Sequence, residues 1–417
     1  MATENNNKTL NVPNLRFPEF SGEWDRIKVS DLLEFYPTNS LSWEQLDYSD
    51  KGVFNLHYGL IHKGLPTQVD VSENSLPTIK EEYIPKKMSL CQNGDIAFAD
   101  ASEDTNDVAK CIEFANCEDQ KIVCGLHTIH GRDTQNKTIT GYKGYAFSAR
   151  AFREQIRRLA QGTKIYSISS GNFSECYIGI PTKAEQNKIA SLLLAVDQRI
   201  ATQIKIIEDL KKLKSAISNI LFARKDLLEK QITISEIGTL KNGYAFQSST
   251  YNPAGSYKII TIANVSGERY IDIDSCNCIM RIPEDIQTHQ VLKQDDILIS
   301  LTGNVGRVSL CTEGNYLLNQ RVGLLQLKQS VNREYIYQAL SCRRFEQTMI
   351  SCGQGAAQMN IGKGDVEDYT IPYSANSLNL EVVASTLKTY DLLISVEVDK
   401  LRLFMQQKQY LLAQMFI

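Results

Sequence analysis

The sequence has 417 residues, of which 42% are hydrophobic and 22% are charged, with a formal net charge of −3. This length predicts two or three domains, and the composition is typical of an ordinary globular protein. It contains no apolar run of membrane-spanning length and no signal-peptide pattern, so we expect a cytoplasmic protein without membrane contact. The acidic balance counts against nucleic-acid binding but does not exclude it, because a local basic surface can coexist with acidic regions elsewhere.

In chain order, the sequence predicts five parts. These are a polar N-terminal segment (1–22), a mixed globular domain (23–182), a long helix (183–228), a second mixed globular domain (229–374) and a second long helix (375–417). Within the globular domains, short β-type runs such as 121–124, 257–262 and 296–300 alternate with turn signals such as Asn242-Gly243. The predicted fold class is therefore α+β.

The two long helices share one sequence pattern. Apolar residues recur at alternating spacings of four and three, as in a coiled-coil seam, and each position of the first helix has a counterpart 194 residues later. Even the polar interruptions repeat, since Gln203 and Lys214 correspond to Glu397 and Lys408. We interpret the helices as one structural unit used twice, although spacing alone does not distinguish parallel from antiparallel packing. The apolar seam consists of Ile189, Leu193, Val196, Ile200, Ile207 and Leu210 in the first helix and Val383, Leu387, Tyr390, Ile394, Leu401 and Phe404 in the second.

The sequence lacks the common catalytic signatures. It has no G-x-x-x-x-G-K-[ST] loop, no G-x-G-x-x-G after a strand, no Asn-Pro-Pro-Tyr and no H-E-x-x-H, so we assign no catalytic residue. Its ten cysteines form no C-x-x-C pair, and we expect reduced, mostly buried thiols and no metal site. The carboxylates between 100 and 107 suggest cation binding, but a solvated acidic loop is more common. These absences favour a binding protein over an enzyme.

Several segments resemble the specificity subunits of type I restriction–modification systems. In the first domain they are PNLRFPEF (13–20), NLHYGLIHK (55–63), GDIAFADASED (94–104), GLHTI (125–129) and AQGTKIYSIS (160–169). In the second domain, NGYAF (242–246), TGNVGR (302–307) and NQR (319–321) resemble a different domain type of the same family. The helices resemble the family's conserved spacers, each preceded by Ile-Pro, with Glu185-Gln186 at the start of the first. In the second copy Ser377-Leu378-Asn379 stands in place of Glu-Gln, and otherwise the resemblance covers nearly the whole chain.

The resemblance implies a fold and a function. Two target recognition domains would each be followed by a spacer helix, and the helices would pack as an antiparallel coiled coil with pseudo-twofold symmetry. Each domain would read one half of a bipartite, asymmetric site in double-stranded DNA. Two methyltransferase subunits, using S-adenosylmethionine, would methylate adenine N6, and restriction/translocase subunits would use ATP and Mg²⁺. The chain itself would be non-catalytic and would hold no cofactor.

Polar residues in the family-like segments are the candidates for DNA contact, because base edges and phosphates are read by such side chains. For each of them an ordinary loop residue is the alternative; His57 and His127 also fit core histidines, and Tyr244 and Phe246 fit core aromatics. In the first domain the candidates are His57, Tyr58, His62, Lys63, Asp100, Ser102, Glu103, His127, Gln161 and Lys164. In the second they are Tyr244, Phe246, Gln247, Thr302, Asn304, Arg307, Gln320, Arg321, Gln354 and Gln358.

Two other functions remain open from the residues alone. The first is a coiled-coil scaffold or adaptor whose two globular domains bind proteins, which the sequence pI of about 6.1 favours. The second is a nuclease fused to its own DNA reader, against which the missing motifs argue. The excess of basic residues between 183 and 225 fits either a solvated helix face or a surface for phosphates or a partner subunit. A steep salt dependence of DNA binding discriminates a DNA reader from an adaptor.

Overall fold

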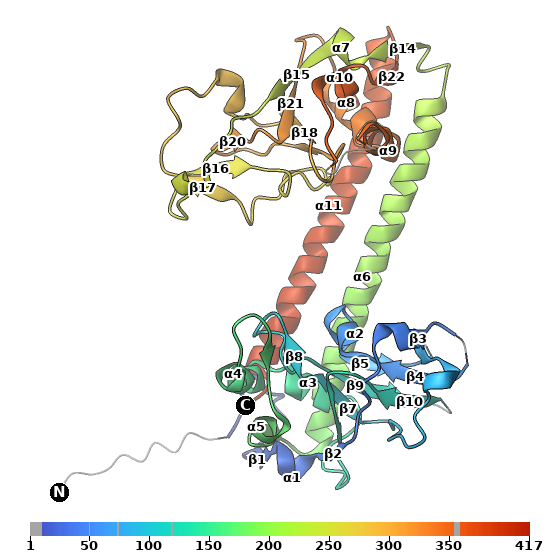
Figure 1. Ribbon diagram of the computed structural model, residues 1–417, viewed down its shortest axis with the longest axis vertical. Coiled ribbons are helices and arrows are strands. Elements are labelled where there is room, and N and C mark those ends of the chain that lie inside the picture. The colour runs from blue at the N-terminus through green and yellow to red at the C-terminus, as the bar shows by residue number, and fades with distance from the viewer. Residues whose placement is uncertain (1–10, 50, 73–74, 118–119, 354–358) are drawn as a thin grey trace, which may run out of the picture. The chain divides into compact units, whose positions relative to one another are not determined.

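The computed structural model describes residues 11–49, 51–72, 75–117, 120–353 and 359–417. The chain forms two compact units, of which unit 1 is Met1–Gln203 with Lys400–Ile417 and unit 2 is Ile204–Asp399. Two long helices, α6 (Lys183–Ala223) and α11 (Ser377–Gln414), each contribute one end to either unit (Figure 1). No helix among the described residues combines the length and the hydropathy of a membrane span.

Unit 1 holds a globular α+β domain built on two main sheets. The five-stranded sheet has the order β2-β11-β7-β9-β5 and the four-stranded sheet the order β10-β4-β6-β3. The elements are β1 (Asp25–Lys28), α1 (Val29–Leu32), β2 (Glu34–Tyr36), β3 (Leu46–Asp47), β4 (Val53–Leu56), α2 (Tyr58–His62), β5 (Gln68–Asp70), β6 (Thr78–Ile79), β7 (Ile96–Ala99), β8 (Ala101–Ser102), β9 (Cys111–Asn116), β10 (Lys121–Cys124), β11 (Thr128–Arg132), α3 (Lys143–Ser148), α4 (Arg150–Leu159), β12 (Tyr166–Ser167), α5 (Ser170–Ser174) and β13 (Tyr177–Ile180).

Unit 2 is built similarly, on a four-stranded sheet of order β15-β21-β18-β19 and a three-stranded sheet of order β17-β16-β20. Buried residues of α8, α9 and the first sheet form its largest apolar core together with the start of α11. The elements are β14 (Lys230–Thr233), α7 (Ile234–Ile237), β15 (Gly238–Asn242), β16 (Tyr257–Ile260), β17 (Asn277–Ile279), β18 (Ile297–Ser300), β19 (Val308–Leu310), β20 (Tyr316–Leu318), β21 (Val322–Leu327), α8 (Arg333–Leu340), α9 (Arg343–Cys352), α10 (Lys363–Glu367) and β22 (Thr370–Tyr373).

The same frame closes each globular domain. In unit 1 the first strand, β1, pairs antiparallel with β13, the last strand before α6. In unit 2 the first strand, β14, pairs antiparallel with β22, the last strand before α11. A short helix follows the first strand in both cases, α1 after β1 and α7 after β14. The structure therefore confirms one α+β architecture used twice along the chain.

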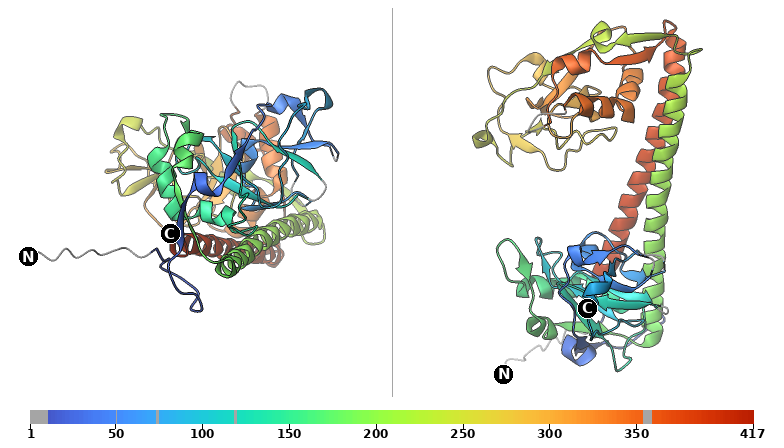
Figure 2. Two further views of the ribbon diagram at one scale, coloured as in Figure 1. Left: turned by 90° about the horizontal axis from the view of Figure 1, so that it is seen from below. Right: turned by 45° about the vertical axis from the view of Figure 1, so that its right-hand side comes forward.

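The helix pair is antiparallel in both units. In unit 1, Lys408 near the end of α11 pairs with Asp197 near the start of α6, with Nζ 2.6 Å from Oδ1. In unit 2, Lys214 of α6 pairs with Asp391 of α11 at 2.5 Å. These residues are equivalent by the repeat of 194, so one ion pair occurs twice with the helices exchanging roles. Figure 2 shows the helix segments lying side by side within each unit. Two helices with the same seam pattern, including the same polar positions, produce such a twofold-like relation when they pack antiparallel.

The seam residues lie on the covered face of both helices. Ile189, Leu193, Val196, Ile207, Val383, Leu387 and Ile394 are buried, and Ile200, Leu210, Tyr390, Leu401 and Phe404 are half-buried. The structure ends α6 at Ala223, before the end of the range 183–228 that the sequence suggested. The chain turns there because Leu228 inserts into the apolar core of unit 2.

Candidate nucleic-acid interface

In unit 1, aromatic and polar candidates gather around the short helix α2. His57 caps its N-terminus, since His57 Nδ1 accepts a hydrogen bond from the Gly59 amide at 3.1 Å. The Tyr58 ring lies 4.7 Å from the ring of His57, 5.8 Å from that of His62 and 5.3 Å from that of His127. Segments far apart in the sequence thus form one cluster, because β10 and β4 run parallel and place the residues that follow them side by side.

The members of this cluster differ in exposure. His57 is buried, and its ring packs 4.4 Å from that of Trp43. Burial lowers the pKa of His57, with smaller contributions from His127 and Lys63, and therefore favours the neutral imidazole. The geometry makes His57 a helix cap, whereas Tyr58 is half-buried and Lys63 is exposed. Lys63 Nζ lies over the Trp43 ring at 5.7 Å.

The chain that follows β7 joins the same cluster. His127 Nδ1 lies 3.1 Å from Asp100 Oδ1, and the Asp100 amide donates to the His127 carbonyl. His62 Nε2 donates to the Ala101 carbonyl at 2.9 Å. His127 has a φ of 54°, a left-handed conformation that is uncommon outside glycine and that turns its half-exposed side chain outward.

The remaining first-domain candidates flank this cluster. Ser102 lies on β8, which pairs antiparallel with β12, and Gln161 forms a bridge with Ser167 of β12. The side chains of Glu103, Gln161 and Lys164 are exposed. The structure therefore brings His57, Tyr58, His62, Asp100 and His127 together, while Glu103 and Lys164 lie next to β8 and β12 in the chain.

In unit 2, the candidates occupy neighbouring loops at the ends of β15, β18 and β20. The Tyr244 carbonyl accepts a hydrogen bond from the Gln320 amide at 2.9 Å. The Tyr244 hydroxyl donates to Asp285 Oδ1 at 2.8 Å, and this hydrogen bond raises the pKa of Tyr244. The Tyr244 ring lies 4.9 Å from that of Phe246, and Phe246 packs against a small apolar core. Gln247 and Gln320 are exposed.

The hairpin between β18 and β19 carries three further candidates. Thr302 Oγ1 donates to Asn360 Oδ1 at 3.1 Å, and Asn304 is exposed at the tip. The Arg321 carbonyl accepts from the Leu301 amide at 3.0 Å, which places exposed Arg321 beside this hairpin. Arg307 points toward α9, where its Nε lies 3.6 Å from Glu346 Oε1. Gln354 and Gln358 lie outside the described residues.

Sequence reasoning missed a cluster of arginines on α4. Arg150, Arg153 and Arg157 line a surface pocket of about 410 Å³ together with Asn106. Arg153 Nη2 donates to the Asn106 carbonyl, while its Nη1 is buried without a hydrogen-bond partner among the described residues. Burial lowers the pKa of Arg153, so the guanidinium would gain from an anion in this pocket. The helical spacing of three and four between these arginines was the available signal.

The Glu185-Gln186 pair at the start of α6 has an internal role. Glu185 is buried and accepts two hydrogen bonds from Arg16, each at 2.7 Å, and one from Trp24 Nε1 at 3.3 Å. Gln186 Oε1 accepts from the Ile139 amide at 2.9 Å. These side chains bind the start of α6 to the N-terminal segment and to the globular domain. In the second copy, Asn379 Nδ2 donates to the Leu227 carbonyl at 3.0 Å and makes a comparable attachment.

Comparison with known proteins gives a consistent family. A family model for the type I restriction modification DNA specificity domain matches residues 116–212 and 229–401. A putative type I restriction enzyme MjaX specificity subunit from Methanocaldococcus jannaschii is 23% identical over 411 residues, which cover 94% of this chain and 92% of that protein. The type I restriction enzyme MjaVIII specificity subunit from the same organism is 25% identical over 279 residues, covering 61% and 64%.

Two solved structures share the fold. The S subunit of a type I restriction–modification system from M. genitalium superposes with a TM-score of 0.55 at 17% identity, covering 97% of this chain and 99% of that one. A chain from a type I R-M system, solved in work on complex assembly and conformational transition, gives a TM-score of 0.55 at 14% identity and covers 93% and 96%.

Proposed function

The chain belongs to the family of type I restriction–modification DNA specificity subunits, and we propose that it reads a bipartite, asymmetric DNA site with one globular domain for each half. The observation that carries this proposal is that two globular domains with different main sheets are attached to the chain in the same way. Both domains close through the same strand pair and continue into equivalent helices. Their main sheets differ, however, with five and four strands in unit 1 and four and three in unit 2.

Unequal domains on equivalent supports predict unequal half-sites. Two readers joined by a stiff connector bind with a high effective concentration at one spacing only, which produces a fixed gap. A symmetric dimer of one reader would instead favour a palindrome. In this proposal the candidates around α2 and around the β18–β19 hairpin supply the base contacts, and the α4 arginines supply phosphate contacts.

The helices α6 and α11 supply the surface for the partner enzymes. Both carry several large apolar side chains that are exposed in this chain, and exposed apolar residues on a helix are available to pack against a partner. They are Ile204, Ile206, Leu213 and Ile220 on α6 and Leu378, Val382, Leu392, Leu393, Val396, Val398, Leu403, Met405 and Tyr410 on α11. We propose that two methyltransferase subunits dock here and bring S-adenosylmethionine, and that restriction/translocase subunits bring ATP and Mg²⁺. The chain itself would supply specificity and no cofactor.

Exchanging residues 23–182 for the first domain of another family member tests the modular arrangement. Methylation mapping with the partner methyltransferase should show one changed half-site, an unchanged second half and an unchanged gap. A change in both halves would refute the assignment of one domain to each half.

A second experiment tests the connector. One additional helical turn is inserted after Gln203 and another after Asp399, where the helices pass from one unit to the other. Because a turn advances about 5.4 Å and a base pair about 3.4 Å, the gap should lengthen by about one or two base pairs. Half-sites that change while the gap stays constant would contradict the role of the helices.

A further inference from the structure

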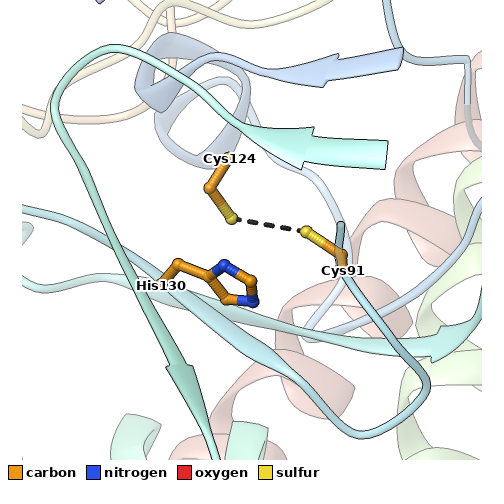
Figure 3. Close-up of side chains that lie close together, drawn as sticks. All are labelled: Cys91, Cys124 and His130. Carbon is orange, nitrogen blue, oxygen red and sulfur yellow. Dashed lines mark hydrogen bonds between the residues drawn. The ribbon is translucent and has the colours of Figure 1, made fainter. Parts of the chain in front are cut away.

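Three metal-ligating side chains meet in the interior of unit 1, behind the loop that carries His127. Cys91 follows a bridge between Leu90 and Val123, Cys124 ends β10, and His130 lies within β11. Their relative exposures are 5%, 1% and 0% for Cys91, Cys124 and His130. One ligand atom from each residue lies within 4.8 Å of the other two. Figure 3 shows the two sulfur atoms and the imidazole converging between strands of different sheets.

The hydrogen bonds of His130 determine which ring nitrogen is available. Nε2 lies 2.8 Å from Oδ2 of Asp95, whose side chain is 1% exposed. Asp95 also accepts from Arg132 Nε at 2.8 Å and Nη2 at 2.7 Å, so the carboxylate stays ionised and accepts the Nε2 proton. In the neutral imidazole this leaves an unprotonated Nδ1, an acceptor that is buried without a partner among the described residues. In Figure 3 one ring nitrogen faces the sulfurs of Cys91 and Cys124.

The spacing of the two sulfurs also fits a shared ion. Cys91 Sγ lies 3.6 Å from Cys124 Sγ. Two thiolates bound to one tetrahedral zinc at about 2.3 Å would lie about 3.8 Å apart. A disulfide needs about 2.05 Å, so the observed separation is closer to that of two ligands on one metal.

We propose that Cys91, Cys124 and His130 form a binding site for a thiophilic divalent cation of the zinc type. Sγ of each cysteine and Nδ1 of His130 supply three ligands, and a solvent molecule completes the tetrahedron. Two thiolates neutralise the charge of the ion, so that the buried site carries no net charge. Asp95 acts as a positioning residue, in the carboxylate–histidine–metal arrangement that fixes ring orientation in known sites.

The location gives the ion a structural consequence. Cys124 borders a cavity of about 580 Å³, which supplies a path for the ion, and His127 lines the same cavity. Cys124 and His130 lie on either side of residues 125–127, the loop that carries His127. A bound ion would link β10 of one sheet to β11 of the other and restrain this loop. The C-x32-C-x5-H spacing matches no short zinc motif, which is why the pattern of residues does not indicate the site.

Cobalt titration of the full chain, reduced and freed of metal with a chelator, tests the proposal. Co²⁺ should bind at about one ion per chain and give the near-ultraviolet thiolate charge-transfer band and the visible bands of a tetrahedral site. Cys91→Ser and Cys124→Ser should lose these bands. The control Cys176→Ser removes another buried thiol of unit 1, outside the cluster, and should keep them. Zinc at a hundredfold excess over its dissociation constant should raise the melting temperature by roughly 5–10 °C.

A second measurement uses the unaltered chain, so that it tests the proposal even if a cysteine variant fails to fold. Alkylation with and without zinc is mapped by mass spectrometry, and zinc should protect Cys91 and Cys124 while leaving the rate at exposed Cys352 unchanged. Equal alkylation of Cys91 and Cys124 in both conditions, or cobalt spectra without thiolate bands, would overturn the proposal.

Discussion

The repeated ion pair of the helix seam makes a quantitative prediction. Lys214 Nζ lies 2.5 Å from Asp391 Oδ1, and the side chains are 19% and 9% exposed. At an effective dielectric constant of about 20, the attraction at this distance is about 6–7 kcal/mol. Desolvation of both ions offsets most of it, so we expect a net coupling of about 1–3 kcal/mol. Asp391→Asn alone should cost more, about 2–4 kcal/mol, because it weakens the pair with Lys214 and also the pair between Asp391 Oδ2 and Arg269 Nη1 at 3.1 Å.

A double-mutant cycle of Asp391→Asn and Lys214→Met measures this coupling by urea unfolding. Both tryptophans, Trp24 and Trp43, belong to unit 1, so fluorescence follows that unit while circular dichroism follows both. The loss should appear in circular dichroism and leave the fluorescence transition unchanged. Lys211→Met, which removes an exposed pair with Glu268, is the matched control and should cost less than about 1 kcal/mol. Additive effects within about 0.5 kcal/mol would refute the coupling.

Three further predictions follow from the seam, from His57 and from α4. Leu210→Asp places a charge in the half-buried seam and should destabilise unit 2 by at least about 2 kcal/mol. The control Leu213→Asp, at a position that is 47% exposed, should have no such effect. Equal urea midpoints for the two variants would count against the seam. Because burial lowers the pKa of His57, the folded state binds fewer protons than the unfolded state. The stability of unit 1 should therefore fall as the pH drops through the ordinary histidine range near 6.5. His57→Asn should flatten this pH dependence, and an unchanged slope would contradict the burial argument. The double variant Arg153→Gln, Arg157→Gln should weaken binding to all DNA sequences alike. The slope of log affinity against log salt concentration should fall by about one for each phosphate that is no longer neutralised. Weakening that depends on the DNA sequence would indicate base contact instead.

The sequence predicted the features that periodicity encodes. The seam spacing placed both long helices, and the repeat of Lys214 at Lys408 showed that they are equivalent. Antiparallel packing was expected only from the family resemblance. The seam spacing could not indicate it, because Asp197 and Asp391, which pair with Lys408 and Lys214, lie outside the seam positions. The β-type runs at 121–124, 257–262 and 296–300 correspond to β10, β16 and β18.

Contacts between distant segments were not predictable in the same way. The resemblance placed Glu185 and Gln186 at the start of the first spacer, but it did not reveal that both side chains are turned into their own unit. Cys91, Cys124 and His130 lie in three separate segments and meet only because the two sheets pack together. The role of His57 as a helix cap likewise depends on a backbone amide that the pattern of residue types does not reveal.

If this chain gives sequence specificity to a DNA methyltransferase, as we propose, the DNA methylation pattern of a host cell should depend on it. The chain is co-expressed with the proposed methyltransferase partner in a host without adenine methylation, and the genome is mapped for N6-methyladenine. One split motif with two unequal halves and a fixed gap should appear, and it should be lost when this chain is omitted. If the methyltransferase binds S-adenosylmethionine and both proteins accumulate, yet no split motif forms, the claim is contradicted and the protein-binding adaptor becomes the better description.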